Sequence, residues 1–243
     1  MAKICIDAGH GGKDPGATNG HDYEKTLALQ ISLKLSENLK KQGFSTVLTR
    51  NNDTYPELLE RCNIANKNNC DLFISIHLNS GNATANGIET LVYANTGDNH
   101  KIATYIQDEL IKATASRNRG IKERKDLCVL NSTKMTAVLI EVGFISSPTE
   151  LASLKTEAYQ NKIVMAITKA VCKYFNKTYS EGAQMAEKRY NLISEIPESL
   201  RPEIKELIDC GALRGNNNGL DLSYDMARIL VIIKRYCDLK SKK

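Results

Sequence analysis

The sequence contains no tryptophan in its 243 residues. A carbohydrate-binding surface built from stacked indole rings is therefore excluded. Ten tyrosines are present, so some aromatic contact with a sugar remains available. Without tryptophan, one common way of binding a glycan is ruled out. Polar or metal-binding residues remain the candidates for a functional site.

Long apolar runs are also absent. The longest candidate, residues 229–233, is far shorter than the roughly 20 residues that a membrane-spanning helix needs. The opening Met1-Ala2-Lys3 leads directly into an apolar strand and has none of the features of a secretory signal peptide. We therefore expect synthesis in the cytoplasm and no membrane partner. A target outside the cell would require a separate release factor, such as a holin.

Paired cysteines are a third absence. The seven cysteines are scattered, their number is odd, and no Cys-x-x-Cys motif occurs. This pattern argues against a disulfide framework or a thiolate metal site and favours reduced, buried thiols. The formal net charge of +5 is a mild excess that suits work near an acidic polymer such as a bacterial wall. We expect no nucleic-acid partner.

Alternating apolar segments and amphipathic segments fill the first three quarters of the chain. The pattern predicts an α/β fold, with a twisted, mostly parallel sheet flanked by helices on both faces. Apolar runs predict strands at residues 3–7, 45–49, 71–77, 87–93, 126–130 and 137–142. Helical periodicity predicts helices at residues 23–42, 56–68, 98–115 and 159–175, with a short one from Ser147.

The pattern changes near residue 176, after which only helical periodicity is visible. We predict a catalytic domain at residues 1–178, a polar linker at 179–186 and a small all-α module at 187–243. So short a module buries little surface alone, so we expect it to pack on a partner copy or on the main domain. Residues 196–198, 204–207, 211–215 and 222–228 distantly resemble a single S-layer-homology-type helical repeat, and this resemblance implies cell-wall targeting or self-association. The alternative is a helical tail packed on the catalytic domain. Met185 is a possible second start site, which would yield a free C-terminal fragment that assembles with full-length chains into a homo-oligomer.

Four polar residues occupy positions where polar residues are costly or exposed at strand ends. His10 and His77 each end an apolar strand, Glu24 lies on the apolar stripe of the first helix, and Glu141 interrupts an apolar strand. Each has an ordinary alternative: a turn cap for His10, a satisfied core histidine for His77, a first-turn glutamate for Glu24 and an ion-paired carboxylate for Glu141. Together, two imidazoles and one carboxylate form a three-ligand catalytic zinc set, with the second carboxylate as a base.

Five short motifs give the chain a resemblance to a known family. They are residues 6–12 (Ile-Asp-Ala-Gly-His-Gly-Gly), 23–25 (Tyr-Glu-Lys), 49–50 (Thr-Arg), 75–80 (Ser-Ile-His-Leu-Asn-Ser) and 140–144 (Ile-Glu-Val-Gly-Phe). In this order they resemble the zinc-dependent N-acetylmuramoyl-L-alanine amidases of the type 3 family. The resemblance covers about residues 3–176.

The resemblance implies one Zn²⁺ held by His10, Glu24 and His77, with Glu141 as the catalytic glutamate. The implied substrate is peptidoglycan, cleaved at the amide between N-acetylmuramic acid and L-alanine by zinc-activated water with Glu141 as general base. Asn79 and Arg50 are candidate substrate contacts, for a stem-peptide carbonyl and a carboxylate respectively. A loop cap and a structural ion pair are their respective alternatives.

The biological setting stays open at this level. The missing secretion signal favours a phage endolysin that lyses a Gram-positive, clostridial-type host. One alternative is a host sporulation or autolytic amidase with the same chemistry. Two others are a zinc carboxypeptidase that shortens stem peptides and a catalytically inactive wall-binding protein.

Overall fold

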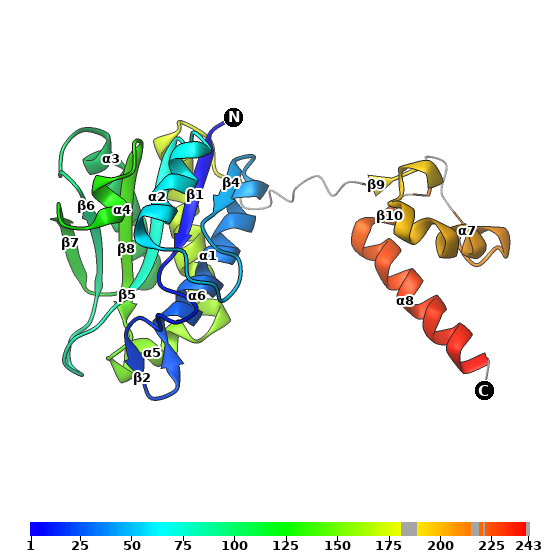
Figure 1. Ribbon diagram of the computed structural model, residues 1–243, viewed down its shortest axis with the longest axis horizontal. Helices are drawn as coiled ribbons and strands as arrows, with labels where there is room; N and C mark the ends of the chain where they lie inside the picture. The colour runs from blue at the N-terminus through cyan, green and yellow to red at the C-terminus, as the bar shows by residue number, and fades with distance from the viewer. Residues whose placement is uncertain (181–188, 215–218, 221, 242–243) are drawn as a thin grey trace. The chain divides into compact units, whose positions relative to one another are not determined.

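The computed structural model of the chain describes residues 1–180, 189–214, 219–220 and 222–241. The chain divides into two compact units, Met1–Ala183 and Gln184–Lys243 (Figure 1). Most of the predicted linker at 179–186, including Met185, lies outside the described residues. The domain limits drawn from the sequence therefore stay a prediction.

Within residues 1–180, one six-stranded sheet forms the centre of the first unit. Its order is β4 (Ser45–Leu48), β1 (Lys3–Ala8), β5 (Leu72–Asn79), β8 (Thr136–Phe144), β6 (Ile88–Val92) and β7 (Asn118–Glu123). The first four strands run parallel to one another, whereas β6 runs antiparallel to β8 and parallel to β7. The predicted mostly parallel α/β sheet is confirmed.

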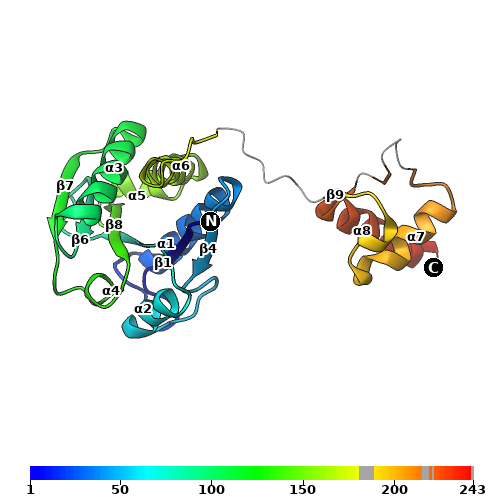
Figure 2. The same ribbon diagram turned by 90° about the horizontal axis from the view of Figure 1, so that it is seen from above.

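Helices cover both faces of this sheet, as Figure 2 shows in the view from above. One face is covered by α1 (Glu24–Lys41), α3 (Gly97–Thr114) and α6 (Glu157–Tyr174), which contribute to the larger apolar core. The other face is covered by α2 (Leu58–Lys67) and α4 (Cys128–Asn131), which form a smaller core. The helix α5 (Pro148–Leu154) follows β8, with the Ser147 hydroxyl accepting a hydrogen bond from the backbone N–H of Glu150. Because both faces are covered, the central strands are mostly apolar, and the polar residues on them, such as Asp7, His77 and Glu141, stand out.

The strand predicted at residues 126–130 is wrong. Residues 128–131 form α4, and the edge strand is β7 at residues 118–123. The segment 128–130 is apolar because α4 packs Val129 and Leu130 against the sheet. The true edge strand, Asn-Arg-Gly-Ile-Lys-Glu, is polar because it has a neighbour on one side only and is partly exposed.

No disulfide joins cysteines among the described residues, although Cys210 and Cys237 are exposed rather than buried. In the described part of the chain, no helix combines the length and apolar character needed to cross a membrane.

The second unit contains more than helices. Its helices α7 (Arg201–Asp209) and α8 (Tyr224–Ser241) accompany two short 3₁₀ turns, η1 (Ile193–Glu195) and η2 (Glu198–Leu200). A short antiparallel pair, β9 (Arg189–Tyr190) with β10 (Leu222–Ser223), was not expected from the helical periodicity. Strands this short carry no readable alternation of apolar and polar residues. A separate small core centres on Tyr190, Ile196, Leu200, Ile204, Leu222, Ala227 and Val231.

Candidate metal centre and active site

His10 stands in a strained turn just after β1. Its backbone has φ of +60°, a left-handed conformation that non-glycine residues rarely adopt. The preceding Gly9 leaves room for the His77 ring, because a Cβ there would lie 2.4 Å from that ring. The turn sets the two imidazoles edge to face with 4.9 Å between ring centroids. A strained residue held in this way is typical of functional sites.

Glu24 joins the two histidines from the first residue of α1. The short hairpin β2 (Thr18–Asn19) and β3 (Asp22–Tyr23) leads the chain back to this point. The Glu24 carboxylate is buried, with Oε2 3.2 Å from His10 Nε2 and Oε1 2.9 Å from His77 Nδ1. One potential ligand atom from each of the three residues lies within 4.8 Å of the others. The structure therefore brings together the three residues that the sequence singled out.

The charge balance of this triad suits a cation. Burial alone would lower the pKa of His10, but its hydrogen bonds and opposite charges at Glu24 and Asp14 raise that pKa to about 9. Burial would likewise raise the pKa of Glu24, but its bonds to His10 and His77 hold it well below its usual range. In a metal site, a divalent ion binds such ligands in their deprotonated form, and a proton is released as it binds. Two imidazoles and one carboxylate are a donor set that zinc accepts.

Asp14 supports His10 from behind, a role that the sequence analysis missed. Its Oδ2 lies 2.8 Å from His10 Nδ1, while Oδ1 accepts a hydrogen bond from the backbone N–H of Gly16 at 3.0 Å. Because Asp14 contacts Nδ1 of His10, the other ring nitrogen, Nε2, faces Glu24. Carboxylates that bind the second nitrogen of a ligating histidine fix its orientation and tautomer. The four-residue spacing between His10 and Asp14 in the glycine-rich loop was the available signal.

Glu141 reaches the same site through strand register. It lies on β8 directly beside His77 on β5, and paired residues of neighbouring strands share one face. Its Oε2 atom is buried and has no hydrogen-bond partner among the described residues. Burial, with the added charges of Glu24 and Glu89, raises the pKa of Glu141 to about 7 despite the opposing effect of His77. Such a carboxyl group can both accept and return a proton near neutral pH.

A buried ion pair anchors the loop that carries His10. Asp7 accepts hydrogen bonds from Thr49 at 2.6 Å, Ser75 at 2.7 Å and the Arg61 guanidinium at 2.8 Å. Arg61 also donates to the backbone carbonyls of Ala8 and His10, each at 2.7 Å. This network ties the end of β1 to α2 and fixes the backbone of the loop that carries His10.

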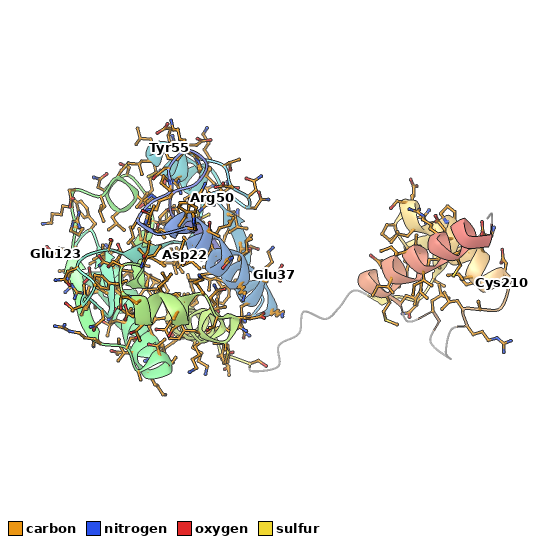
Figure 3. The ribbon with its side chains drawn as sticks, turned by 90° about the horizontal axis from the view of Figure 1, so that it is seen from below. Asp22, Glu37, Arg50, Tyr55, Glu123 and Cys210 are labelled. Atoms are coloured by element: carbon orange, nitrogen blue, oxygen red, sulfur yellow. The ribbon has the colours of Figure 1, made fainter. Side chains whose placement is uncertain are left out.

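Arg50 does not have the surroundings of a substrate contact. Its side chain is buried and donates to four backbone carbonyls, those of Ala8, Gly9, Lys25 and Asn52. The predicted carboxylate-binding role is therefore corrected: Arg50 holds the loop after β1 against the start of α1. Figure 3 labels it among the side chains of the first unit.

The Asn79 amide is also engaged. It donates to Glu89 Oε1 at 2.9 Å and accepts from the backbone N–H of Ser80 at 2.9 Å. The predicted stem-peptide contact stays a prediction, and the observed contact is one that orients Glu89.

A cleft of about 210 Å³ opens beside the two histidines. Its mostly apolar far wall comes from α2, α4 and β8 and is formed by Leu58, Leu127, Val129 and Leu139, with Tyr55 and Asp126 beside them. With the two histidines and an apolar wall both in its lining, the cleft can hold an extended, partly apolar ligand beside the His10–Glu24–His77 cluster.

Comparison with known proteins covers the first unit. The N-acetylmuramoyl-L-alanine amidase family model, Amidase_3, matches residues 4–173. The sporulation-specific N-acetylmuramoyl-L-alanine amidase of Bacillus subtilis is 40% identical over 189 residues, covering 75% of this chain and 72% of that protein. The endolysin of Bacillus phage SPP1 is 33% identical over 195 residues, covering 77% and 72%. The crystal structure of an N-acetylmuramoyl-L-alanine amidase from Clostridium difficile 630 superposes with a TM-score of 0.69 at 37% identity, covering 73% of this chain and 98% of that one.

Proposed function

This chain belongs to the N-acetylmuramoyl-L-alanine amidase family and is a peptidoglycan amidase, and on that premise we propose that it works with one Zn²⁺ held by His10, Glu24 and His77. The donor set fits that ion, because two imidazoles and one buried carboxylate converge within 4.8 Å of one another. A bound zinc ion supplies Lewis-acid polarisation of the scissile carbonyl and a water of lowered pKa.

Glu141 moves the proton in this reaction. Its unpartnered Oε2 takes a proton from the attacking water and later returns it to the nitrogen of the departing L-alanine. Asp14 keeps the His10 ring in place through Nδ1 during both steps. The apolar wall of the cleft limits water around the reacting amide. The observation that carries the proposal is the His10–Glu24–His77 cluster with Glu141 beside it on the same face of the sheet.

The testing experiment is digestion of purified peptidoglycan followed by mass analysis of the new ends. We expect intact muramic acid lactyl groups and stem peptides with a free L-alanine amine. A shortened stem peptide with its L-alanine amide intact would instead show a carboxypeptidase, and unchanged walls would show an inactive binding protein. Adding a strong chelator should stop the release, and adding back zinc should restore it.

Two biological settings share this chemistry. Similarity to the phage SPP1 endolysin supports lysis of a Gram-positive host after holin-dependent release, and similarity to the sporulation-specific amidase supports a host role in sporulation or autolysis. Measuring when the protein is expressed distinguishes the two settings. Expression together with late phage genes supports the endolysin role, and expression in sporulating cells supports the host role.

The second unit extends the proposal. The family match ends at residue 173, before this unit begins, and the unit has its own small core. We propose that it targets the enzyme to the wall or mediates self-association, with a fragment that starts at Met185 as a partner. A chain ending at residue 180 should bind walls more weakly than the full chain but cleave soluble fragments at a similar rate. Intact-mass measurement of the expressed protein checks for the fragment.

A further inference from the structure

A line of polar side chains crosses the sheet beside the candidate metal centre. His77 on β5 is paired with Glu141 on β8, and Glu141 is paired with Glu89 on β6. Paired residues of neighbouring strands project from the same face, so the three side chains form one row. The edge strand β7 lies next in the sheet, and Figure 3 shows its last residue, Glu123, at the outer margin of the first unit.

The row ends in two cations that share one carboxylate. Glu89 Oε2 accepts from Arg119 Nε at 2.7 Å and from Lys122 Nζ at 2.6 Å, while Glu89 Oε1 accepts from Asn79. Two positive charges against one negative charge leave this group with a surplus of positive charge. Arg124, further along, is paired with Asp126 and adds no such surplus.

One positive charge is enough to neutralise the Glu89 carboxylate, yet both Arg119 and Lys122 contact it. The Lys122 side chain is 45% exposed and that of Arg119 is 26% exposed, so both can be reached from solvent. Arg119 has five N–H groups, of which the described structure uses one toward Glu89 and one toward the carbonyl of Asn86. Its guanidinium carbon lies 4.9 Å from the centre of the Phe144 ring, a cation–π contact that uses none of the N–H groups. The arrangement is one that suits a second, external carboxylate.

We propose that Arg119 and Lys122 bind the carboxylate of the stem-peptide residue that follows L-alanine, with Glu89 positioning both cations. This inference rests on the proposed function, because it takes the scissile amide to lie at Glu141. The strand β7 is two positions beyond β8 in the sheet, about 10 Å at ordinary strand spacing. Two extended peptide residues span about 7 Å, and long basic side chains cover the remainder. In peptidoglycan the residue concerned is D-glutamate, whose α-carboxyl is free in some walls and amidated in others.

The experiment compares two soluble muramyl tripeptides that differ only at this group, one with a free α-carboxyl and one with an α-amide. We expect kcat/KM for the free acid to exceed that for the amide by about tenfold or more, since a charge-assisted contact is lost with the amide. Lys122→Gln and Arg119→Gln should each bring this ratio several-fold closer to one, and Lys122→Arg should keep it. Lys162→Gln, an exposed charge change on α6 across the sheet, should leave the ratio as in the wild type.

The outcomes separate this inference from the proposed function. Cleavage of both tripeptides at the L-alanine amide with equal kcat/KM would overturn the inference and leave the amidase function intact. A drop for both tripeptides by one factor in the Lys122 and Arg119 variants would also overturn it, because a purely structural role predicts an unchanged ratio. Failure to cleave either tripeptide, or purified walls, at that amide would overturn the proposed function itself.

Discussion

Two carboxylates with buried oxygens in the same sheet, those of Asp7 and Glu141, have opposite surroundings. Asp7 accepts hydrogen bonds from Thr49, Ser75 and Arg61, and its pKa is lowered because the Arg61 charge and these bonds outweigh burial. Glu141 keeps an oxygen without a partner in the described structure, and burial raises its pKa to about 7. A carboxylate with all its hydrogen bonds made stays ionised and stabilises the folded structure. A buried carboxyl group without partners lowers the stability of the fold but can accept and release a proton during a reaction.

The sharpest way to test this contrast is Glu141→Gln, which keeps the shape and removes the titrating group. We expect kcat to fall by roughly 1,000-fold or more, because proton transfer by a positioned base contributes about 10²–10⁴-fold. Zinc content and thermal stability should be retained. The measurement is the release rate of L-alanine amines from purified walls, with metal analysis of the same samples.

The matched control for that variant is Glu37→Gln, an exposed change on α1 away from the cleft, which should be neutral. His77→Ala should differ from Glu141→Gln by losing zinc as well as activity. Normal turnover by Glu141→Gln would contradict the claim that Glu141 transfers a proton in catalysis, and the contrast with Asp7 would then concern stability alone.

The reverse test is Asp7→Asn, which should damage the fold more than the chemistry of any folded fraction. Removing one member of a buried ion pair leaves Arg61 uncompensated, at a cost of about 3–5 kcal/mol. Urea unfolding of the metal-free protein measures this loss as a lower transition midpoint. A variant as stable as the wild type would show that the ion pair contributes specificity of structure rather than free energy.

Sequence reasoning located the parts of the site that sit on regular elements. His77 lies near the end of an apolar strand, Glu24 shares the stripe of Leu27, Ile31 and Leu35, and His10 follows an apolar strand by two residues, so local periodicity was enough to place them. The same periodicity predicted most of the sheet. It failed at the edge strand β7, where exposure removes the apolar signal, and at β9 and β10, which are too short to show one.

The remaining parts depend on contacts between residues distant in sequence. The bond between Asn79 and Glu89, the two cations on Glu89, and the four carbonyls that Arg50 reaches all arise from strand order and loop paths. A single sequence does not reveal which side chains meet across a sheet. Arg50 shows the consequence: a basic residue within a family motif suggested a ligand contact, whereas in the fold it bonds to backbone carbonyls.

Asp14 is a third carboxylate, intermediate between the first two, because its one side-chain partner is His10. Asp14→Ala should weaken zinc binding by about 10- to 100-fold, the usual cost of losing the group that orients a metal-ligating histidine. Competition against a chelator of known affinity measures this without reference to activity. An unchanged zinc affinity would show that the strained backbone of His10 alone is enough to orient the ring.

The smallest expected effect is the pH dependence of the Asp7 contribution. Since the pKa of Asp7 is lower in the folded chain than in the unfolded one, its stabilising effect is fully present above the unfolded value of about 3.8 and is lost as the pH falls through the folded value. The difference in unfolding free energy between wild type and Asp7→Asn should therefore stay constant from pH 7 to about 5 and shrink below about 4. Urea titrations of both metal-free proteins over this range measure it. A difference that instead grew on acidification would mean that Asp7 is held protonated in the fold, and the contrast with Glu141 would disappear.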